Sequence, residues 1–292
     1  MAYSDSRQSK IMMDNDGKMK IYADGEALEV AVVEFSPEWE NPSANMAALD
    51  RIFDALFSSG EYPAPDLVVL PEFFAAGFTM NPGAAEDAAA SPTLAWMEST
   101  VAHFRCALAG SVPVREAGKR YNRLFFLQPV TSCAGTDGSV SVSWYDKAHL
   151  FFGGEDSNYT PGESRKVFVY KGWKILPGIC FDLRFPEWAR NTGDSPYDLY
   201  LNVANWPSAR NAAADILVKA RSIENVCWSV FCNRTGHDTL LEYSGRSAVI
   251  DYRGRSRGDR ACICGLPVLR ARLEKAPMYR FRENFPILDR IK

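Results

Sequence analysis

The order of its apolar segments constrains the fold of this chain more than any other feature of the sequence. Short apolar runs of strand length alternate with segments whose apolar residues recur at helical spacing. Strands are predicted at 28–35, 66–74, 106–114, 121–129, 140–150, 198–207, 227–234 and 247–255, with a hairpin at 166–180. Helices are predicted at 41–60, 91–104 and 208–226. This interleaving indicates a layered α/β domain with mixed sheets rather than a purely parallel, doubly wound sheet.

The chain is predicted to contain a single domain over residues 27–292. Its 292 residues accommodate one large α/β domain, and neither an internal repeat nor a linker divides this range. Residues 1–26 show no hydrophobic periodicity. We interpret them as a flexible or weakly packed N-terminal extension.

Charge and cysteine content exclude several classes of function. Lys and Arg total 33 against 36 Asp and Glu, so no basic excess favours nucleic-acid binding. No apolar stretch approaches the ~18 residues that span a bilayer, and the polar N-terminus lacks the apolar core of a signal peptide. Seven cysteines, an odd number mostly in apolar runs, indicate reduced thiols. We therefore expect a cytoplasmic protein without a nucleic-acid or membrane partner.

Three chemically reactive residues share one kind of placement. Glu72, Lys147 and Cys180 each lie at or just past the C-terminal end of a predicted apolar strand. Side chains at such strand ends can converge on one crevice in an α/β fold. Aromatic neighbours on both sides of Glu72 and Lys147 would keep water out of that crevice.

These residue types together can perform nucleophilic catalysis on a carbonyl. A carboxylate within hydrogen-bond reach can take the proton of the Cys180 thiol, and a helix N-terminus after Cys180 would favour the thiolate. The Lys147 ammonium and the backbone N–H of Phe181 can then stabilise the oxyanion. Each residue also has a structural interpretation. Alone, Cys180 would be a small buried side chain, Glu72 a cap or surface residue, and Lys147 a solvated cation.

Three local motifs, in the same order, resemble the carbon–nitrogen hydrolase (nitrilase) superfamily. They are "LPEFFAAGF", "YDKAHLFFGGE" and "GICFDLRFPEWAR". The resemblance implies that Glu72 is the general base, Lys147 the oxyanion stabiliser and Cys180 the nucleophile. Glu155, eight residues after Lys147, matches the second glutamate of the family, which positions lysine and substrate.

The resemblance covers nearly the whole chain from about residue 28 and carries expectations about architecture. It implies a four-layer α-β-β-α sandwich that commonly forms a homodimer through its helices or a larger homo-oligomer. It also implies an enzyme that needs no metal and no organic cofactor. The segment 259–277 has no confident match in this comparison.

Within the superfamily, "CFDLRFPEWARN", "LYLNVANWPSAR" and "RFRENFP" resemble the omega-amidase-like branch. The expected reaction releases ammonia from a small carboxylate-bearing amide such as 2-oxoglutaramate or 2-oxosuccinamate. Arg184, Asn205, Trp206 and Phe78 are candidate substrate-binding residues. Arg184 has a competing role in bracing the Cys180 turn, and Trp206 in filling the core. Further pocket candidates are Arg210, Phe74 and Phe152.

Alternative functions remain open at this point. Another branch of the superfamily would hydrolyse an N-carbamoyl amino acid or a different amide, and a nitrile substrate is a further option. A member of another class would keep only the scaffold and serve as a non-catalytic interaction protein. Cys262 and Cys264 raise the question of a metal or redox site, although the sequence offers no second ligand pair.

Overall fold

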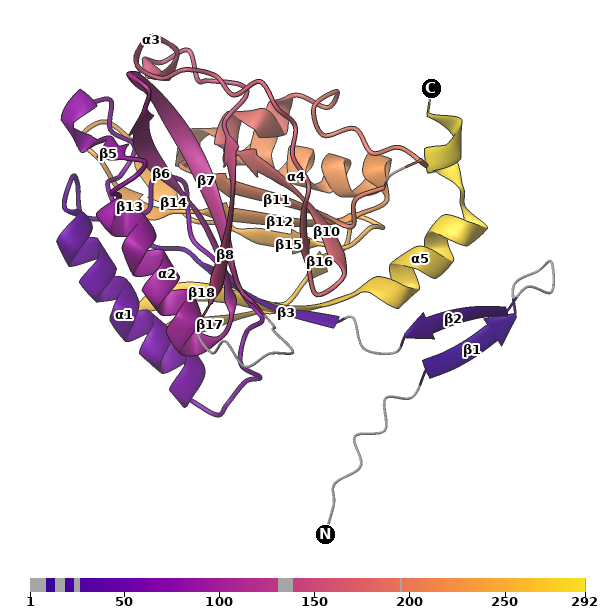
Figure 1. Ribbon diagram of the computed structural model, residues 1–292. Helices are drawn as coiled ribbons and strands as arrows, with labels where there is room; N and C mark the ends of the chain where they lie inside the picture. Colours follow the sequence, from indigo (N-terminus) through magenta and orange to yellow (C-terminus); the bar gives the residue numbers. More distant parts are fainter. Residues whose placement is uncertain (1–8, 14–18, 24–26, 131–138, 195, 292) are drawn as a thin grey trace.

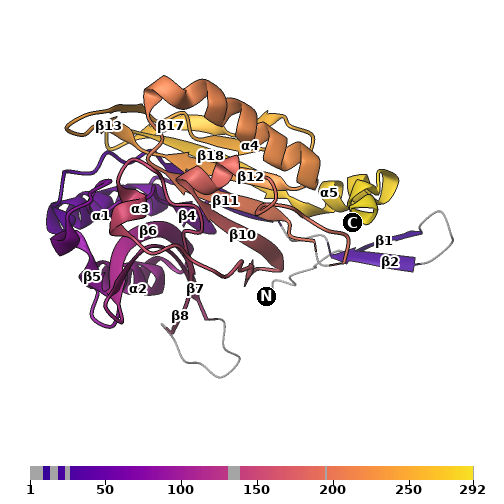
Figure 2. The ribbon, with the colours of Figure 1, turned by 90° about the horizontal axis from the view of Figure 1, so that it is seen from above.

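The main body of the molecule is built from four layers, in the order helices, sheet, sheet, helix. The computed structural model describes residues 9–13, 19–23, 27–130, 139–194 and 196–291. In Figure 2, α4 lies on one side of the body and α1 and α2 on the other, with the strands between them. The four-layer α-β-β-α sandwich predicted from the sequence is confirmed.

The larger sheet has eight strands, and its central strands run parallel. Strands β3, β4 and β6 pair in parallel, short strand β5 also pairs in parallel with β6, and the other pairs are antiparallel. Its order is β17-β18-β3-β4-β6-β7-β8 with β5 on β6. The bounds are β3 Ala27–Val33, β4 Leu67–Val69, β5 Glu86–Asp87, β6 Ala107–Glu116, β7 Lys119–Pro129, β8 Val140–Asp146, β17 Asp259–Ile263 and β18 Leu266–Glu274.

The smaller sheet has six strands in the order β16-β15-β12-β11-β10-β9. Its three central strands, β10, β11 and β12, are parallel. The predicted hairpin is present, because Lys171 and Gly172 both adopt positive φ (44° and 76°) in the turn between β9 and β10. The bounds are β9 Phe168–Tyr170, β10 Trp173–Ile179, β11 Leu199–Ala204, β12 Trp228–Asn233, β15 Ala248–Ile250 and β16 Ser256–Arg257.

Three amphipathic helices cover the outer faces of the sheets (Figure 1). Helices α1 (Pro42–Ser58) and α2 (Pro92–Phe104) pack on the larger sheet, and α4 (Asn211–Asn225) packs on the smaller one. Ser91 caps α2: its side chain accepts the Leu94 N–H at 3.0 Å. Helix α4 is preceded by one 3₁₀ turn and is therefore shorter than the predicted 208–226.

The principal core lies between the two sheets. One cluster of buried side chains joins the inner faces of both, with Val32 and Leu124 from the larger sheet and Leu201 and Val230 from the smaller. Alternating side chains of the same strands face the helices on the outside. This arrangement brings the C-terminal ends of the central strands of both sheets to a common edge.

Shorter elements complete the structure. They are β1 Ser9–Met13, β2 Met19–Ala23, β13 Thr235–His237, β14 Glu242–Ser244, α3 Glu155–Asn158, α5 Lys275–Asn284, and 3₁₀ helices at Pro82–Ala84, Cys180–Arg184, Ser208–Arg210 and Ile287–Arg290. Strands β1 and β2 pair with each other in a separate sheet, which projects from the body in Figures 1 and 2. The rest of the predicted extension, 1–26, lies outside the described residues.

The structure differs from the sequence analysis at three elements. Strand β4 ends at Val69 rather than at residue 74, because the chain turns before Phe73, whose φ is positive at 48°. The unmatched segment 259–277 supplies β17 and β18, and β18 pairs with the full length of β3. The pair β1–β2 forms where no element was predicted.

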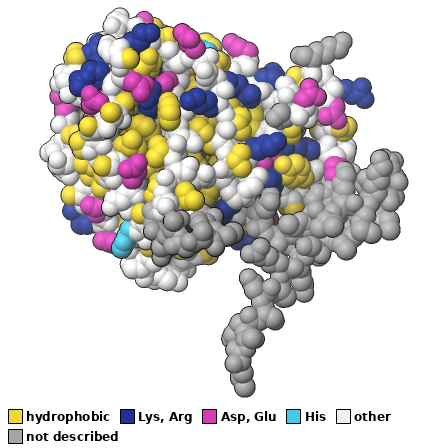
Figure 3. All heavy atoms as spheres, in the orientation of Figure 1, with side chains coloured by type: hydrophobic (Ala, Val, Ile, Leu, Met, Phe, Trp, Pro, Cys, Tyr) yellow, Lys and Arg dark blue, Asp and Glu magenta, His cyan; other side chains and the backbone are white. Residues whose placement is uncertain are grey.

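On the face shown in Figure 3, Lys and Arg side chains alternate with Asp and Glu, as the small net charge leads one to expect. In the described part of the chain, no helix combines the length and the apolar character needed to cross a membrane.

Candidate active site

The three predicted catalytic residues meet at the common edge of the two sheets. Glu72 follows β4 and Lys147 follows β8, both in the larger sheet, whereas Cys180 follows β10 of the smaller sheet. Lys147 Nζ lies 2.8 Å from Glu72 Oε1, and both side chains are fully buried. The sequence prediction that these strand ends converge is therefore confirmed, and residues 75 and 108 positions apart become neighbours.

Glu72 is held by groups from both sheets. Its Oε2 accepts the backbone N–H of Asn205 at 2.8 Å, and its own backbone carbonyl accepts Asn205 Nδ2 at 2.8 Å. Asn205 follows β11 of the smaller sheet. On the other side, Ser111 Oγ accepts the N–H of Phe73 at 2.9 Å. The carboxylate is thus fixed in place before any substrate arrives.

Lys147 lies between two carboxylates. Its Nζ is 2.8 Å from Glu155 Oε2 as well as from Glu72, and the Phe151 N–H donates to Glu155 Oε2 at 2.8 Å. Burial alone would lower the pKa of Lys147, but the charges of Glu155 and Glu72 outweigh it and raise that pKa. Lys147 is therefore a permanent cation. Glu155 lies where the sequence analysis expected a residue that positions the lysine.

Cys180 occupies a strained turn directly after its strand. Its φ is 44°, in the left-handed region, and a single 3₁₀ turn, Cys180–Arg184, follows it. Burial raises the pKa of the Cys180 thiol well above its usual range, and the charge and hydrogen bond of Glu72 raise it further against the opposing charge of Lys147. The expectation that a helix N-terminus favours the resting thiolate is thus wrong, because one 3₁₀ turn cannot offset burial beside two carboxylates.

Asp182 braces this turn, and sequence reasoning did not identify it. The carboxylate is fully buried and accepts four hydrogen bonds at 2.8–2.9 Å, from the Ile179 N–H, the Tyr145 hydroxyl, and both the N–H and Nδ1 of His149. It therefore ties the Cys180 turn to the segment that carries Lys147. Its position two residues after the cysteine was the only signal in the sequence.

Asn122, on β7, is a second buried residue that sequence reasoning missed. Its Nδ2 lies 2.7 Å from Glu72 Oε1 and 2.7 Å from Glu155 Oε1. In the sequence it is one polar residue within an apolar strand. Only the pairing register of that strand shows that it faces the site.

A small cavity of about 90 Å³ opens onto Cys180. The proposed substrate residues Arg184, Asn205, Trp206 and Phe78 all line it, as do Phe181 and the further candidates Arg210 and Phe152, together with Phe151, Pro207, Leu241 and Tyr243. This volume is well below the roughly 300–1,000 Å³ of most ligand pockets, so the cavity admits only a small molecule. Phe74 is not among the lining residues: it is fully buried in the core beneath α1 and α2.

The structure shows what several lining side chains already contact. The Trp206 indole N–H donates to the Arg210 carbonyl at 2.8 Å, so its ring, not its N–H, is available to the cavity. The Arg184 guanidinium lies 5.1 Å from the Trp206 ring centre, and that of Arg210 lies 5.1 Å from the Phe151 ring centre. It is Asp182, not Arg184, that braces the Cys180 turn. Both arginines remain exposed at the cavity.

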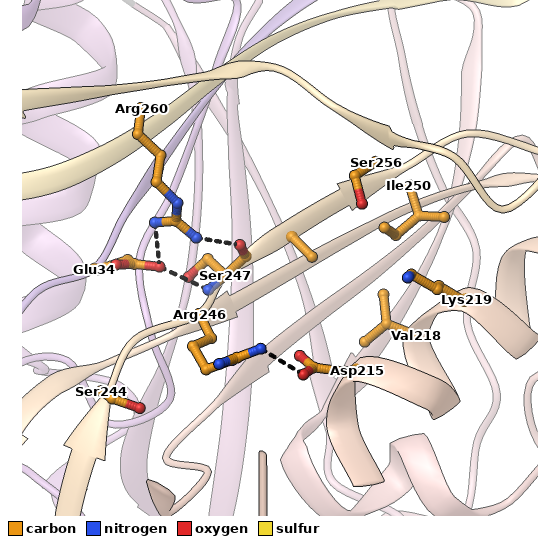
Figure 4. A pocket seen from close by; sticks show the side chains of 11 residues that line it. Glu34, Asp215, Val218, Lys219, Ser244, Arg246, Ser247, Ile250, Ser256 and Arg260 are labelled. Atoms are coloured by element: carbon orange, nitrogen blue, oxygen red, sulfur yellow. Dashed lines mark hydrogen bonds and ion pairs between the residues drawn. The ribbon is translucent and has the colours of Figure 1, made fainter. Parts of the chain in front are cut away.

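A separate pocket lies at the N-terminal half of α4, away from Cys180 (Figure 4). Four of its five charged side chains form two ion pairs: Arg246 with Asp215 at 2.7 Å and Arg260 with Glu34 at 2.9 Å. None of its eleven lining residues is a cysteine. This pocket therefore contains no thiol.

The other cysteines lie apart from this site. Cys106, Cys227 and Cys232 are buried, and Cys262 and Cys264 are exposed on the β17–β18 hairpin; all of these and Cys180 are free thiols. Cys133 lies outside the described residues. Within the described ranges, no group of three or more His, Cys, Asp or Glu side chains is arranged to hold a metal ion.

Comparison with known proteins agrees with this geometry. The carbon-nitrogen hydrolase family matches residues 29–258. The chain is 38% identical to an omega-amidase YafV of Yersinia enterocolitica over 85% of its length and 90% of that protein. It is 29% identical to a 2-oxoglutaramate amidase of Bacillus subtilis, over 90% of this chain and 97% of the other.

A solved structure of the same superfamily has the same fold as this chain. XC1258 from Xanthomonas campestris, a CN-hydrolase superfamily protein with an arsenic adduct in its active site, superposes with a TM-score of 0.79. The two are 35% identical, and the match covers 91% of this chain and 98% of that one. Family, fold and site geometry agree, and the chain belongs to the carbon-nitrogen hydrolase (nitrilase) family, in its omega-amidase-like branch.

Proposed function

We propose that this protein is an omega-amidase, which hydrolyses the terminal amide of a small carboxylate-bearing metabolite and releases ammonia. The observation that carries the proposal is the buried contact of Glu72 and Lys147 beside Cys180, which lines a small cavity. The names of its omega-amidase and 2-oxoglutaramate amidase relatives support the choice of 2-oxoglutaramate or 2-oxosuccinamate as substrate.

The reaction begins with the proton of Cys180. Because burial keeps the thiol neutral, Glu72 takes this proton as sulfur attacks the amide carbonyl. The Lys147 ammonium and the Phe181 N–H stabilise the oxyanion of the tetrahedral intermediate. Glu72 then delivers its proton to the leaving nitrogen, and ammonia departs from the thioester.

A water molecule completes the cycle. Glu72, again a carboxylate, takes a proton from that water as its oxygen attacks the thioester carbonyl. The acid product leaves as Glu72 returns the proton to the Cys180 sulfur. Throughout, Glu155 holds the Lys147 ammonium at the carbonyl oxygen through its 2.8 Å contact.

Two exposed arginines give the cavity its preference for an anionic substrate. Arg184 and Arg210 both line it, and a guanidinium binds a carboxylate through paired hydrogen bonds. The rings of Trp206 and Phe78 supply apolar walls for the carbon chain between the carboxylate and the amide. Asn205 contributes mainly by holding Glu72.

The test is ammonia release from a panel of amides. Wild type and Cys180→Ala are compared on 2-oxoglutaramate, glutamine, asparagine, an N-carbamoyl amino acid and a simple nitrile. We expect release from the 2-oxo amide that disappears in the variant. Turnover of another compound alone would keep the catalytic roles and reassign the substrate. Turnover retained by Cys180→Ala would refute the mechanism.

We also propose that the enzyme works in the cytoplasm as a homodimer. Free cysteines support the compartment. The outer face of α4 supports the dimer, because Ile216 and Ile223 are 69% and 54% exposed one above the other on this helix. Light scattering at several protein concentrations would check the oligomeric state, and Ile216→Lys should weaken the dimer if α4 forms its interface.

A further inference from the structure

One amide nitrogen joins the two carboxylates of the site. Asn122 Nδ2 lies 2.7 Å from Glu72 Oε1 and equally far from Glu155 Oε1, and all three side chains are fully buried. Both distances are those of short, charge-assisted hydrogen bonds. The other end of the amide, Oδ1, is buried without a hydrogen-bond partner among the described residues.

The surroundings decide which end of this amide is the nitrogen. If the group were turned over, its oxygen would lie 2.7 Å from two carboxylate oxygens, and three acceptors would face one another without a proton. The observed orientation instead leaves one neutral carbonyl oxygen unpaired. The two hydrogen bonds from Nδ2 to the carboxylates therefore stabilise this orientation more than the missing hydrogen bond to Oδ1 destabilises it.

Strand pairing places Asn122 opposite the catalytic lysine. The β7–β8 register pairs Arg123 with Asp146, and the Lys147 N–H donates to the Asn122 carbonyl at 2.9 Å just beyond the end of β8. Opposed residues in an antiparallel pair face the same side. Asn122 and Lys147 therefore reach the carboxylates from adjacent positions, one as a neutral donor and the other as a cation.

The charges of the site call for such a neutral donor. Lys147 supplies one positive charge against two carboxylates. Burial raises the pKa of Glu155, and the charge of Glu72 adds to this effect, whereas Lys147 and the hydrogen bond from Asn122 oppose it. Without Asn122, Glu155 would lose one of the interactions that oppose this rise of its pKa.

The hydrogen bonds also assign the two oxygens of Glu72. Oε1 accepts from both Lys147 and Asn122, which uses its two lone pairs. Oε2 accepts the Asn205 N–H and keeps one lone pair for a proton. A base with one free lone pair takes a proton from one direction only.

We propose that Asn122 is a positioning residue, which keeps Glu155 ionised beside Glu72 and reserves Glu72 Oε2 for proton transfer with Cys180. The inference rests on the proposed role of Glu72 as general base. Asn122 does not line the cavity, so it acts through the carboxylates and not through contact with substrate.

The first test requires no substrate. Unfolding of wild type and Asn122→Leu is compared from pH 5 to pH 8. In the variant Glu155 loses a donor, so its protonation moves to higher pH and the folded state loses stability as pH rises. We expect the difference in unfolding equilibrium constant to grow on the order of tenfold for each unit by which the pKa of Glu155 rises. Asn122→Ala replaces the leucine variant if leucine does not fit.

Asn225→Ala is the matched control. Asn225 is also buried, but its Nδ2 donates to a backbone carbonyl, that of Arg221, at 3.0 Å. Its loss should destabilise the fold by the same amount at every pH. A pH-independent difference for Asn122→Leu, parallel to this control, would overturn the proposal whatever the substrate of the enzyme is.

The second test is kinetic and uses the best substrate from the amide panel. Asn122→Leu should lower kcat by roughly 100-fold with little change in KM, and move the acidic limb of the kcat/KM profile to higher pH. Asn122→Asp should lose more at neutral pH, because it brings a third carboxylate to one ammonium. A uniform loss with an unchanged acidic limb would contradict the proposal.

Discussion

At the scale of single residues, the side chains of the candidate site are also the ones that reduce the stability of the fold. Cys180 adopts a left-handed φ of 44°, a conformation that costs a non-glycine residue roughly 1–3 kcal/mol. Lys147 and two glutamates are buried together. The charge pairing and the hydrogen bonds described above offset these costs, and they leave the thiol neutral until a substrate is present.

Cys180 should react as a thiol of unusually high pKa. Burial beside Glu72 raises this pKa, so the alkylation rate of the substrate-free enzyme by iodoacetamide should still be rising at pH 9.5, above the ordinary cysteine range of about 8.5. Peptide mass spectrometry in a Cys262→Ser, Cys264→Ser background removes the two exposed thiols from the signal. A rate that levels off near pH 8.5 would show that the thiol is not perturbed.

Lys147→Met should abolish turnover and destabilise the fold at neutral pH. The substitution leaves two buried carboxylates without their cation, which costs about 3–5 kcal/mol. The loss should shrink as pH falls and the carboxylates take up protons, so urea unfolding at pH 5 and pH 8 checks the sign. Lys219→Met, an exposed change on α4, is the control and should have little effect at either pH.

The residues of the candidate site differ in how far the sequence could predict them. Glu72, Lys147 and Cys180 lie at strand ends in recognisable local motifs, so their convergence was predictable. Asn122 and Asp182 were not, because their roles depend on which strands pair and in which register. The pKa of Cys180 was predicted in the wrong direction, because a sequence does not show how closely carboxylates surround a thiol.

At the scale of elements, two short turns carry the chemistry, and Asp182 connects them. The segment after β8 carries Lys147 and the turn after β10 carries Cys180, and the Asp182 carboxylate accepts hydrogen bonds from both. A 3₁₀ turn of five residues has little stability of its own. The position of Cys180 relative to Lys147 therefore depends on this carboxylate.

Asp182→Asn should lower kcat/KM by roughly 100-fold while the protein stays folded. An amide oxygen can replace one carboxylate oxygen, but the NH₂ group faces donors and breaks the bonds made by the other. Displacement of the nucleophile by about 1 Å is sufficient for such a loss. Tyr145→Phe, which removes one of the four donors, should have a smaller effect. Equal kcat/KM for Asp182→Asn and wild type would show that the turn holds without the carboxylate.

The β17–β18 hairpin was the largest element without a confident match in the sequence. Its strands contain few consecutive apolar residues, because arginines and glycine interrupt the pattern. Even so, β18 occupies an interior position of the larger sheet, between β17 and β3. Strand partners contributed from a distant part of the chain override weak local signals of this kind.

Leu273→Ala should destabilise the protein by about 2–5 kcal/mol, because Leu273 of β18 is fully buried in the core between the sheets. Leu240→Ala is the matched control: Leu240 is 87% exposed, and its loss should change stability by less than about 0.5 kcal/mol. Chemical denaturation of both variants gives the comparison. Similar changes in the free energy of unfolding for the two variants would mean that Leu273 of β18 contributes little to the core.

At the scale of the whole molecule, the main helices and the central strands were predictable because their signals are long and regular. Helices α1 and α2 have apolar stripes and proline at their first position, and the central strands are apolar runs. The assignment of strands to two separate sheets came from the family resemblance, since periodicity does not indicate which strands pair. The single domain over 27–292 and the extension over 1–26 stay predictions.

Removal of residues 1–26 should leave the enzyme folded and active. Among the described strands, β1 and β2 pair with each other and not with either large sheet, and an isolated two-stranded sheet adds little stability. We expect the thermal midpoint to change by less than about 2 °C and the rate of ammonia release to match that of the full chain. A large fall in the midpoint would assign this segment to the folded domain.

Because the site is divided between two sheets, turnover reports whether the two sheets have docked. Glu72 and Lys147 follow strands of the larger sheet and Cys180 follows a strand of the smaller, so neither sheet alone holds all three residues. A partly folded chain, with both sheets formed but not yet docked, would give a circular dichroism signal for secondary structure and release no ammonia. During refolding, recovered ammonia release should therefore lag behind the circular dichroism signal and coincide with burial of the core between the sheets.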